Sequence, residues 1–359
     1  MMIRRCRPSW PRPTGRQPAP PLSSNRGADM SPDDAVVIAG GGGFIGGYLA
    51  QRLARAGYHD VRVVDVQPTS EWHQSVDHFE NLCVDLRDLD LCRKVARDRA
   101  VVFDLAADMG GMGFIETHRF ECMLSASIGI NLVQACLEAC VERLFFASSA
   151  CVYNVTLQDV PAVAGLRECD AYPAMPEDGY GWEKLFTERL FLNAASEQGL
   201  KVRIGRFHNV YGPHGTWRGG REKAPAAICR KVAEAVISGN HEIEIWGDGI
   251  QTRSFTYIDD AVEGTLRLVS SDCDEPLNIG SERLISINEL VDIVEGIAGV
   301  KLRRTYLADA PLGVRGRNSD NRLIRQRLEW EPSVELEDGL AATYAWVYDR
   351  VANTRSDLP

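Results

Sequence analysis

The sequence lacks the closely spaced cysteines of a zinc site or of a secreted disulfide framework. It has ten cysteines, but they are scattered and none belongs to a C-x-x-C pair. Structural zinc sites and small secreted domains depend on such spacing. We therefore expect no metal, and we expect the reducing cytoplasm as the compartment.

The chain also lacks a basic excess and a long apolar run. Its formal net charge is -10, and no basic stripe follows the first thirty residues. The uncharged stretch at 35–50 is rich in glycine and shorter than the roughly 20 residues that a membrane-spanning helix needs. These absences argue against nucleic-acid and membrane partners.

Acidic residues are almost missing from the first thirty positions, which are rich in arginine and proline. Such a composition cannot form a packed core. Proline also spoils the amphipathic helix of a transit peptide. We expect residues 1–30 to be a disordered extension upstream of a start at Met30. The remaining chain, 45% hydrophobic overall, is long enough for one large or two coupled domains.

A glycine-rich segment follows the apolar run at 35–39 and precedes residues with helical apolar spacing. Glycines between a strand and a helix let a pyrophosphate approach the N–H groups at the helix N-terminus. The spacing differs from G-x-G-x-x-G, and a glycine cluster alone is weak evidence. We predict that Gly40, Gly43, Phe44, Ile45 and Gly46 bind the cofactor.

An acidic residue, Asp65, ends the next apolar run, Val61–Asp65. A carboxylate there accepts hydrogen bonds from ribose hydroxyls and repels a 2′-phosphate, so NAD is favoured over NADP. An exposed acid at the end of a strand is the ordinary alternative. We also assign Asp85 to the cofactor. The repeated strand and helix patterns predict an α/β fold, a Rossmann-type doubly wound parallel sheet.

Tyr180 and Lys184 lie four residues apart at the start of a predicted helix and therefore share one face. A nearby ammonium stabilises a phenolate, so we expect a lowered pKa for Tyr180, which could then act as a base. The sequence SSACVYN, residues 148–154, follows another apolar run. For an arbitrary cysteine, packing is the usual role, but Cys151 lies where a strand end should open onto a ligand.

The glycine spacing, Ser148-Ser149 and Tyr180-x-x-x-Lys184 together resemble the extended short-chain dehydrogenase/reductase family, whose members alter nucleotide sugars with tightly held NAD. Longer blocks at 105–116, 147–153, 203–231, 246–256 and 313–321 are similar to the branch of that family that epimerises GDP-hexoses at carbons 3 and 5. This resemblance implies conversion of GDP-D-mannose to GDP-L-galactose, with GDP-L-gulose as a side product. It also implies a homodimer formed through helices that include the one after Tyr180.

The resemblance gives each reactive residue a role. Tyr180 takes the hydroxyl proton while carbon 4 is oxidised by NAD, Lys184 stabilises the phenolate, and Ser149 or Ser148 binds the sugar oxygen. Cys151 and Lys223 exchange protons at the carbons beside the ketone, and the hydride then returns to carbon 4. Tyr180 and Lys184 also contact the cofactor.

The same resemblance places a set of residues around the nucleotide sugar. Arg317 would bind the diphosphate, with Arg315 the weaker choice and an ion pair between Arg317 and Asp320 the ordinary alternative. Guanidinium groups suit this role because they form paired hydrogen bonds to phosphate. The predicted substrate residues are Gly110, Ser149, Cys151, Asn209, Glu222, Lys223, Lys231, Gln251, Thr252, Arg253 and Arg317.

We expect an NAD-binding domain at 31–210 plus about 251–276, and a smaller C-terminal α/β sugar-binding domain at 211–250 and 277–350. Two features depart from the family pattern: Asn154 replaces the usual proline at the start of a different loop, 154–170, and Trp182 replaces a smaller apolar residue. They put the sugar specificity in doubt rather than the type of reaction.

Three alternatives remain. A 4,6-dehydratase needs an acid and a base where this chain has Ala150 and Cys151, and a 4-epimerase would leave Cys151 and Lys223 without roles. A non-catalytic NAD-sensing scaffold should lose Tyr180 or Lys184, and both are present. His208 and His214 are interpreted as structural.

Overall fold

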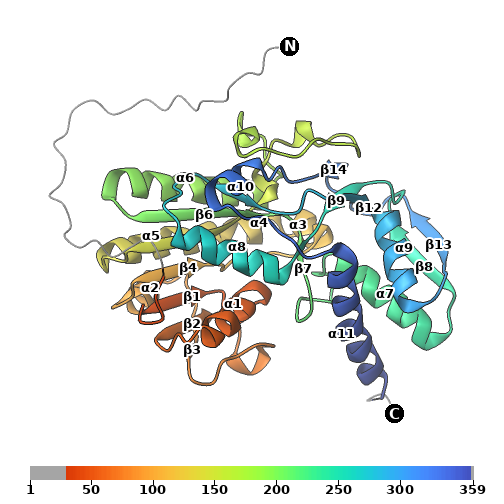
Figure 1. Ribbon diagram of the computed structural model, residues 1–359, viewed down its shortest axis with the longest axis horizontal. Coiled ribbons are helices and arrows are strands. Elements are labelled where there is room, and N and C mark those ends of the chain that lie inside the picture. Colours follow the sequence, from red (N-terminus) through yellow and green to blue (C-terminus); the bar gives the residue numbers. More distant parts are fainter. Residues whose placement is uncertain (1–29, 357–359) are drawn as a thin grey trace.

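A parallel sheet forms the centre of the protein, for which the computed structural model describes residues 30–356 (Figure 1). The predicted extension therefore lies, except for Met30, outside the described residues. Within them the large sheet has the strand order β11-β6-β5-β4-β1-β2-β3, and all neighbours are parallel. This order contains the 3-2-1-4-5-6 arrangement of a doubly wound nucleotide-binding fold, so the predicted fold class is confirmed. The strands are β1 (Val36–Ala39), β2 (Val61–Asp65), β3 (Glu80–Cys83), β4 (Val101–Asp104), β5 (Arg143–Ser149), β6 (Lys201–Phe207) and β11 (Leu277–Ile279).

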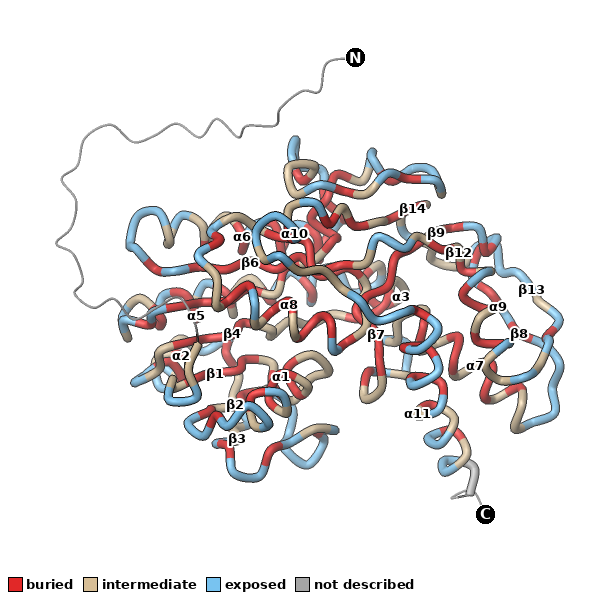
Figure 2. The backbone as a smooth tube through the Cα atoms, viewed as in Figure 1, coloured by how far each residue is buried: buried red, intermediate tan, exposed pale blue. Residues whose placement is uncertain are grey.

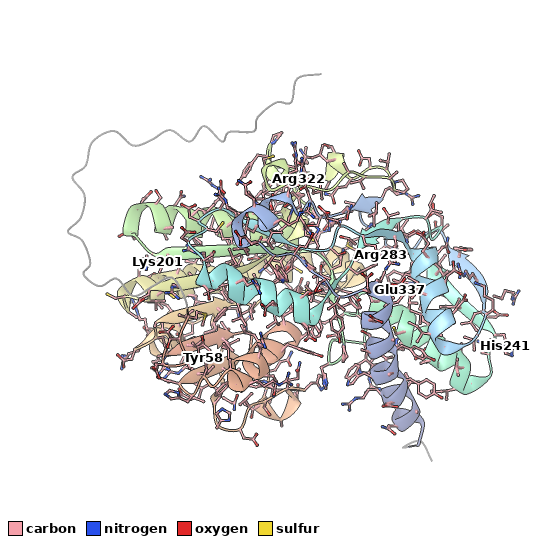
Figure 3. All side chains as sticks on the ribbon, in the orientation of Figure 1. Tyr58, Lys201, His241, Arg283, Arg322 and Glu337 are labelled. Atoms are coloured by element: carbon pink, nitrogen blue, oxygen red, sulfur yellow. The ribbon has the colours of Figure 1, made fainter. Side chains whose placement is uncertain are left out.

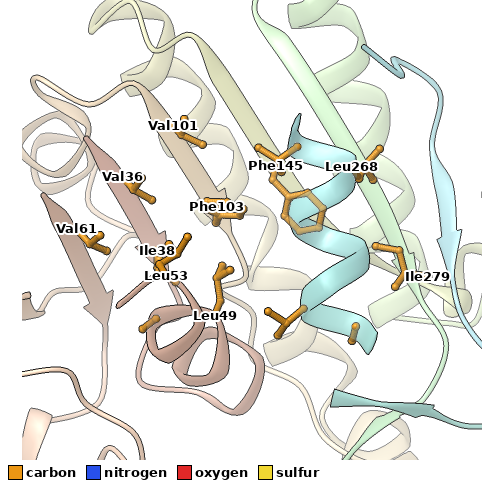
Figure 4. Close-up of a cluster of buried hydrophobic side chains, with 14 of the residues drawn as sticks. Val36, Ile38, Leu49, Leu53, Val61, Val101, Phe103, Phe145, Leu268 and Ile279 are labelled. Atoms are coloured by element: carbon orange, nitrogen blue, oxygen red, sulfur yellow. The ribbon is translucent and has the colours of Figure 1, made fainter. Parts of the chain in front are cut away.

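Helices cover both faces of this sheet because its central strands are apolar on both sides. All four residues of β1 are buried, as expected of a parallel strand between two helical layers. On one face Val36 and Ile38 pack with Leu49 of α1 (Phe44–Arg55) and Leu268 of α8 (Ile258–Ser270) (Figure 4). The other face packs against α2 (Leu89–Ala96), α5 (Ala126–Glu138) and α6 (Tyr180–Gln198).

A second apolar core lies at the other end of the molecule, where Figure 2 shows buried segments of α7, α9 and α11. These helices are α7 (Ala224–Ser238), α9 (Ile287–Ala298) and α11 (Leu336–Ser356). The ion pair between Arg283 and Glu337, both labelled in Figure 3, joins α11 to the segment before β12. The small sheets here pair β8 (Glu242–Trp246) with β13 (Arg303–Leu307), β7 (Val210–Tyr211) with β10 (Thr256–Tyr257), and β9 (Thr252–Ser254) with both β12 (Leu284–Ser286) and β14 (Gly316–Arg317).

The predicted boundary at residue 277 is wrong in one respect. Strand β11, assigned to the sugar-binding domain, pairs with β6 and extends the large sheet. Its three buried residues continue the core of that sheet, and α10 (Arg322–Leu328) packs beside it. Three residues are too few to be recognised as a strand from periodicity alone. The remaining division into two domains stays a prediction.

Short helices connect the main elements near the carboxyl ends of the strands. They are α3 (Met112–Thr117), α4 (Arg119–Leu124) and the 3₁₀ turns η1 (Thr69–Glu71), η2 (Ala150–Val152), η3 (Val155–Leu157) and η4 (Glu168–Ala171). By length and composition alone, Arg119–Glu138 would pass as a membrane span. This stretch is divided into α4 and α5, and α5 packs against α2 and α6, which explains its apolar composition equally well.

Candidate active site

The glycine-rich loop has a backbone that only glycines allow. Gly40 has a φ of +78°, and a Cβ on Gly46 would lie 2.3 Å from the Gly40 carbonyl oxygen. The first turn of α1 carries no acidic side chain. This bare turn at the N-terminus of a 12-residue helix suits a pyrophosphate, so these residues fit a dinucleotide.

Asp65 lies beside this loop at the end of β2. Its carboxylate accepts hydrogen bonds from the backbone N–H of Gly42 at 3.1 Å and of Gln67 at 3.0 Å. The two halves of the predicted cofactor site are therefore adjacent, although the ribose contact itself stays a prediction. Asp85 forms an ion pair with Arg87, whose hydrogen bond lowers the pKa of the Asp85 carboxyl.

A cavity of about 250 Å³ opens at the carboxyl ends of β4, β5 and β6 and extends to α7 and β9. In doubly wound sheets, ligands bind at this edge. Most of the predicted substrate residues line it, although they come from distant parts of the sequence. The predicted substrate residues that line the cavity are Gly110, Ser149, Cys151, Asn209, Glu222, Lys223, Lys231, Gln251, Arg253 and Arg317, and the predicted base Tyr180 lines it as well.

Tyr180 and Lys184 share one face of α6, as predicted, and both are buried. The Lys184 ammonium lies 5.6 Å from the centre of the Tyr180 ring. Burial raises the pKa of Tyr180 well above its usual value, Cys151 and Glu183 raise it further, and a hydrogen bond with Ser149 opposes them. The lowered pKa expected from the sequence is therefore not found, because desolvation of the phenol dominates.

Lys184 has carboxylate partners that the sequence did not reveal. Its ammonium lies 3.6 Å from the Glu183 carboxylate. Burial raises the pKa of Asp104 to about 7, and Lys184 opposes this shift. Neither acid stood out in the sequence, because adjacent acid and lysine residues are common on helices and Asp104 ends an ordinary apolar strand. Lys184 is thus held behind Tyr180 and does not line the cavity.

The two serines of SSACVYN face opposite ways, because neighbouring side chains alternate along a strand. Ser149 lines the cavity and accepts a hydrogen bond from the Cys151 N–H at 3.2 Å. Ser148 is buried and donates to Glu188, which pairs with Arg206. The structure therefore corrects the prediction for Ser148: it belongs to a core network and not to the cavity.

Cys151 follows β5 in the turn η2, with its side chain at the cavity wall. Burial raises the pKa of this thiol to about 11, Glu177 adds to the rise, and Arg317 and a hydrogen bond with Ser149 oppose it. At neutral pH the group is therefore a thiol with a proton to give. This property distinguishes it from a nucleophilic cysteine, whose pKa is lowered.

Arg317 lies next to this thiol rather than in an open anion site. Its guanidinium donates to Cys151 Sγ at 3.5 Å and to Gln158 Oε1 at 2.7 Å, and it lies 3.1 Å from the Glu177 carboxylate. The expected contact with a diphosphate stays a prediction. Asp320 pairs with Arg322 instead, and Arg315 pairs with Asp248.

Lys223 enters the cavity from the residue that precedes α7. Burial lowers the pKa of its ammonium, the nearby Cys151 opposes this, and Arg317 lowers the pKa further. The segment that carries Lys223 packs on the loop after β4: the Gly111 N–H donates to the Arg221 carbonyl at 2.9 Å. This contact joins the two predicted substrate loops.

Several other predicted residues have partners within the protein. Thr252 points its hydroxyl at the Pro161 carbonyl and does not line the cavity. The remaining contacts of this set are Glu222 with Arg230 at 3.0 Å, Lys231 with the Glu244 carbonyl at 2.7 Å, Gln251 with the Trp246 carbonyl at 2.9 Å and Asn209 with the Ser254 carbonyl at 2.9 Å.

Asn154 and His208 lie behind the cavity wall. The Asn154 amide donates to the Pro173 carbonyl at 3.0 Å, so this departure from the family pattern anchors the following loop and does not line the cavity. Burial lowers the pKa of His208 to about 3, and its ring bonds Asn278 at 2.9 Å, which agrees with a structural role. Among the described residues no group of three His, Cys, Asp or Glu could hold a metal.

Comparison with known proteins gives close relatives over most of the chain. A GDP-mannose 3,5-epimerase 1 from Oryza sativa subsp. indica is 44% identical over 89% of this chain and 83% of its own length. A GDP-mannose 3,5-epimerase from Arabidopsis thaliana is also 44% identical, over 89% of this chain and 84% of its own.

Solved structures show the same architecture. The UDP-glucose 4-epimerase of Thermotoga maritima with UDP-glucose superposes with a TM-score of 0.78 at 25% identity, covering 88% of this chain and 99% of its own. A UDP-glucuronic acid 4-epimerase variant from Bacillus cereus, solved with NAD, gives 0.75 at 25% identity and the same coverage. The model of the NAD dependent epimerase/dehydratase family matches residues 36–280. With the glycine cradle, the acid beside it and the Tyr180–Lys184 pair, these matches establish that the chain belongs to the NAD dependent epimerase/dehydratase family.

Proposed function

We propose that this protein is an isomerase that epimerises GDP-mannose at carbons 3 and 5, giving GDP-L-galactose with GDP-L-gulose as a side product. One observation carries the proposal: the cavity beside Tyr180 and Ser149 presents both a thiol, Cys151, and an amine, Lys223. Inverting a carbon requires a proton to leave one face and another to arrive at the opposite face, so two such groups are needed. The relatives that are 44% identical carry the name of this activity.

NAD would be held by the glycine loop of residues 40–46, by Asp65 and by Lys184. When bound, oxidised NAD supplies a hydride acceptor for carbon 4 and a positive charge in the site. The Tyr180 and Ser149 side chains both line the cavity, where together they would bind the sugar oxygen. Tyr180 must be a phenolate to take the hydroxyl proton. Lys184, 5.6 Å from the ring centre, and the positive charge of bound oxidised NAD would favour the phenolate against the burial that raises the pKa of this phenol. Tyr180 would then hold the hydroxyl proton while carbon 4 is a ketone and give it back on reduction.

Burial acts on Cys151 and Lys223 in complementary directions. It raises the pKa of the Cys151 thiol, which therefore keeps a proton to deliver, and it lowers the pKa of the Lys223 ammonium, which therefore gives up its proton more readily than an exposed lysine. The amine can take a proton from a carbon beside the ketone, and the thiol can deliver one. The ketone makes these carbons acidic, so the geometry supports epimerisation without net redox change.

Other reactions of the family fit less well. A simple 4-epimerase needs only Tyr180 and a sugar that rotates in the site, so Cys151 and Lys223 would have no role in that reaction. A 4,6-dehydratase needs an acidic pair after β5, where this chain has Ala150 and Cys151. A non-catalytic scaffold has no need for the buried lysine behind Tyr180.

Incubation with GDP-mannose in deuterated water tests the function. We expect deuterium at carbons 3 and 5 of the sugar with no net formation of NADH, measured by NMR and by absorbance at the NADH band. Parallel incubations with other GDP- and UDP-hexoses, under the same conditions, measure the specificity. A 6-deoxy-4-keto product with no label at carbons 3 and 5 would contradict the proposal.

We also propose that the protein forms a homodimer through α4, α5 and α6. These three helices contact one another and expose a patch of large apolar side chains. Contiguous apolar surface of this kind commonly marks an interface with a second copy. Trp182 belongs to this outer face of α6, which gives this departure from the family pattern a role away from the cavity. The patch consists of Phe120, Met123, Leu124, Ile130, Trp182 and Phe186.

Sedimentation velocity tests the dimer. The wild-type protein should sediment as a dimer at micromolar concentration, and Phe186→Glu should shift it to the monomer because a charge in the patch opposes burial. A wild-type monomer would remove the proposal. We further propose the cytoplasm as the compartment, supported by the scattered positions of the cysteines, none of which belongs to a C-x-x-C pair.

A further inference from the structure

Glu177 is a buried acid behind two residues that line the cavity, Cys151 and Arg317, and it lies three residues before Tyr180. Its backbone N–H donates to the Cys151 carbonyl at 3.0 Å, so the two residues are fixed to each other through the main chain. The residue is 8% exposed. A carboxylate this deeply buried requires partners, because desolvation of a charge is costly.

Arg317 is the ionic partner of the Glu177 carboxylate, and Cys151 is its neighbour. The guanidinium lies 3.1 Å from the carboxylate. The negative charge of Glu177 adds to the rise in the pKa of the Cys151 thiol. Burial opposes ionisation of Glu177, but Arg317 and Cys151 outweigh it and lower the pKa of this carboxyl. Glu177 therefore holds the negative charge, and Cys151 keeps its proton.

Arg317 contacts both members of this pair. One of its nitrogens donates to Cys151 Sγ at 3.5 Å and to Glu177 Oε2 at 3.3 Å. When the thiol has given its proton away, the same nitrogen can stabilise the thiolate without moving far. The other titratable or charged groups around the thiol are Tyr180 and Cys122 in the same apolar cluster, Lys223 at the start of α7, and Arg253 on β9.

We propose that Glu177 is a positioning residue whose negative charge, next to Cys151 and linked to it through Arg317, keeps the proton on the thiol, so that Cys151 begins the cycle as the proton donor. Arg317 shares its charge between the carboxylate and the sulfur as the proton leaves. In this step a sulfur–hydrogen bond breaks and a carbon–hydrogen bond forms, while Lys223 carries the proton removed from the opposite face of that carbon. After the product has left, Lys223 releases its proton to water and the thiolate takes one from water. The donor role rests on the proposed function, whereas the effect of Glu177 on the thiol does not.

Alkylation of Cys151 by iodoacetamide, followed by peptide mass spectrometry on the NAD-loaded protein between pH 6 and pH 10, tests the proposal without substrate. Glu177→Gln keeps the shape of the side chain but removes its charge, so the thiolate should form at lower pH. We expect alkylation of Cys151 at pH 8 to be at least about fivefold faster than in the wild type, since one pKa unit changes the thiolate fraction about tenfold. Equal rates across the pH range would overturn the proposal.

Glu188→Gln is the matched control, because Glu188 also forms a buried pair with an arginine but lies in the core network of Ser148. It should lower the melting temperature and leave the pH dependence of Cys151 alkylation unchanged. A shift as large as that of Glu177→Gln would assign the effect to general loosening and contradict the proposal. If Glu177→Gln does not fold, Glu177→Asp tests the same proposal. Shortening the side chain by one methylene moves the carboxylate away from the thiol and should still speed alkylation of Cys151 at pH 8. An unchanged alkylation rate would overturn the proposal.

A second measurement separates positioning from structure. In the wild type the rate of deuterium entry into GDP-mannose should fall at high pH, and in Glu177→Gln this fall should begin at a lower pH. The variant should also have kcat reduced about tenfold, with KM little changed. If the wild type exchanges no deuterium, the proposed function fails while the alkylation result still judges the role of Glu177. If the wild type and Glu177→Gln exchange deuterium with the same pH profile, Glu177 does not position the proton of Cys151.

Discussion

Two buried pairs of glutamate and arginine, one in the core and one beside the cavity, differ in how completely they are bonded. In the core, Glu188 accepts two hydrogen bonds from Arg206 and one from Ser148, and the last Arg206 nitrogen reaches the Glu168 carbonyl at 2.7 Å. Beside the cavity, Glu177 Oε1 and Arg317 Nη2 lie 3.1 Å apart but, within the described part of the chain, neither has a hydrogen-bond partner of suitable geometry.

The difference shows what each pair is for. A buried polar network in which every group is bonded makes the structure rigid, and changing it costs stability. A pair with unused bonding capacity next to a thiol can change partners when a proton moves. The same two residue types therefore serve architecture in one place and proton transfer in the other, and the number of bonds they make distinguishes the roles.

Breaking the core pair should give the largest effect. Arg206→Met leaves Glu188 buried without its counter-ion, and we expect the free energy of unfolding to fall by about 5 kcal/mol, the upper end for a broken buried pair. Urea titration followed by circular dichroism measures it. Arg317→Met should lower the free energy of unfolding by clearly less, because fewer hydrogen bonds are lost and Arg317 itself lines the cavity. Equal losses would erase the distinction between the pairs.

Removing the proton donor beside the second pair should affect rate and not folding. Cys151→Ser should slow deuterium entry at carbon 5 a hundredfold or more, roughly 3 kcal/mol in barrier, because a hydroxyl is a much poorer acid than a thiol. NAD binding and the urea midpoint should stay at wild-type values. Exchange at the wild-type rate would return Cys151 to the group of packing residues.

The two neighbouring serines allow the comparison to be made on a single strand. Ser148→Ala should lower the free energy of unfolding by about 2 kcal/mol, because a buried hydrogen bond to a charged acceptor is lost, and leave the exchange rate intact. Ser149→Ala should slow exchange with little effect on unfolding. The opposite pattern would show that the strand faces are assigned the wrong way round.

The smallest effect concerns pH. Burial raises the pKa of Glu168, which borders the core pair, to about 7. The folded state therefore keeps a proton that the unfolded chain has lost between about pH 4.5 and 7, and Glu168 makes stability fall as pH rises through this window. Relative to Glu168→Gln, the wild type should lose roughly 1 to 2 kcal/mol of unfolding free energy between about pH 4.5 and pH 6, measured by urea titration at each pH. A constant difference would mean that Glu168 has an ordinary pKa.

The sequence predicted those parts of the site that follow from short-range patterns. Gly40 to Gly46, Asp65, and the pair of Tyr180 and Lys184 are fixed by a strand–loop–helix pattern and by helical spacing, which are local properties. Cys151 was identified because it follows a strand end. The resemblance to a known family then connected segments that no periodicity joins.

The remaining features depend on contacts between distant segments. Which of Ser148 and Ser149 faces the cavity depends on the register of β5 against its neighbours. The partners of Arg317, namely Gln158 and Glu177, come from two loops whose sequences carry no signal of the contact. The sign of the Tyr180 shift depends on burial, which a helical spacing does not measure.

Gly181 has one further consequence. A Cβ at this position would lie 2.4 Å from the Cys151 carbonyl oxygen, so the start of α6 rests directly on the turn that carries the thiol. The positions of Tyr180 and Cys151 therefore depend on the same backbone contact. Local opening of this contact would therefore displace the two proposed acid/base groups, Tyr180 and Cys151, at the same time.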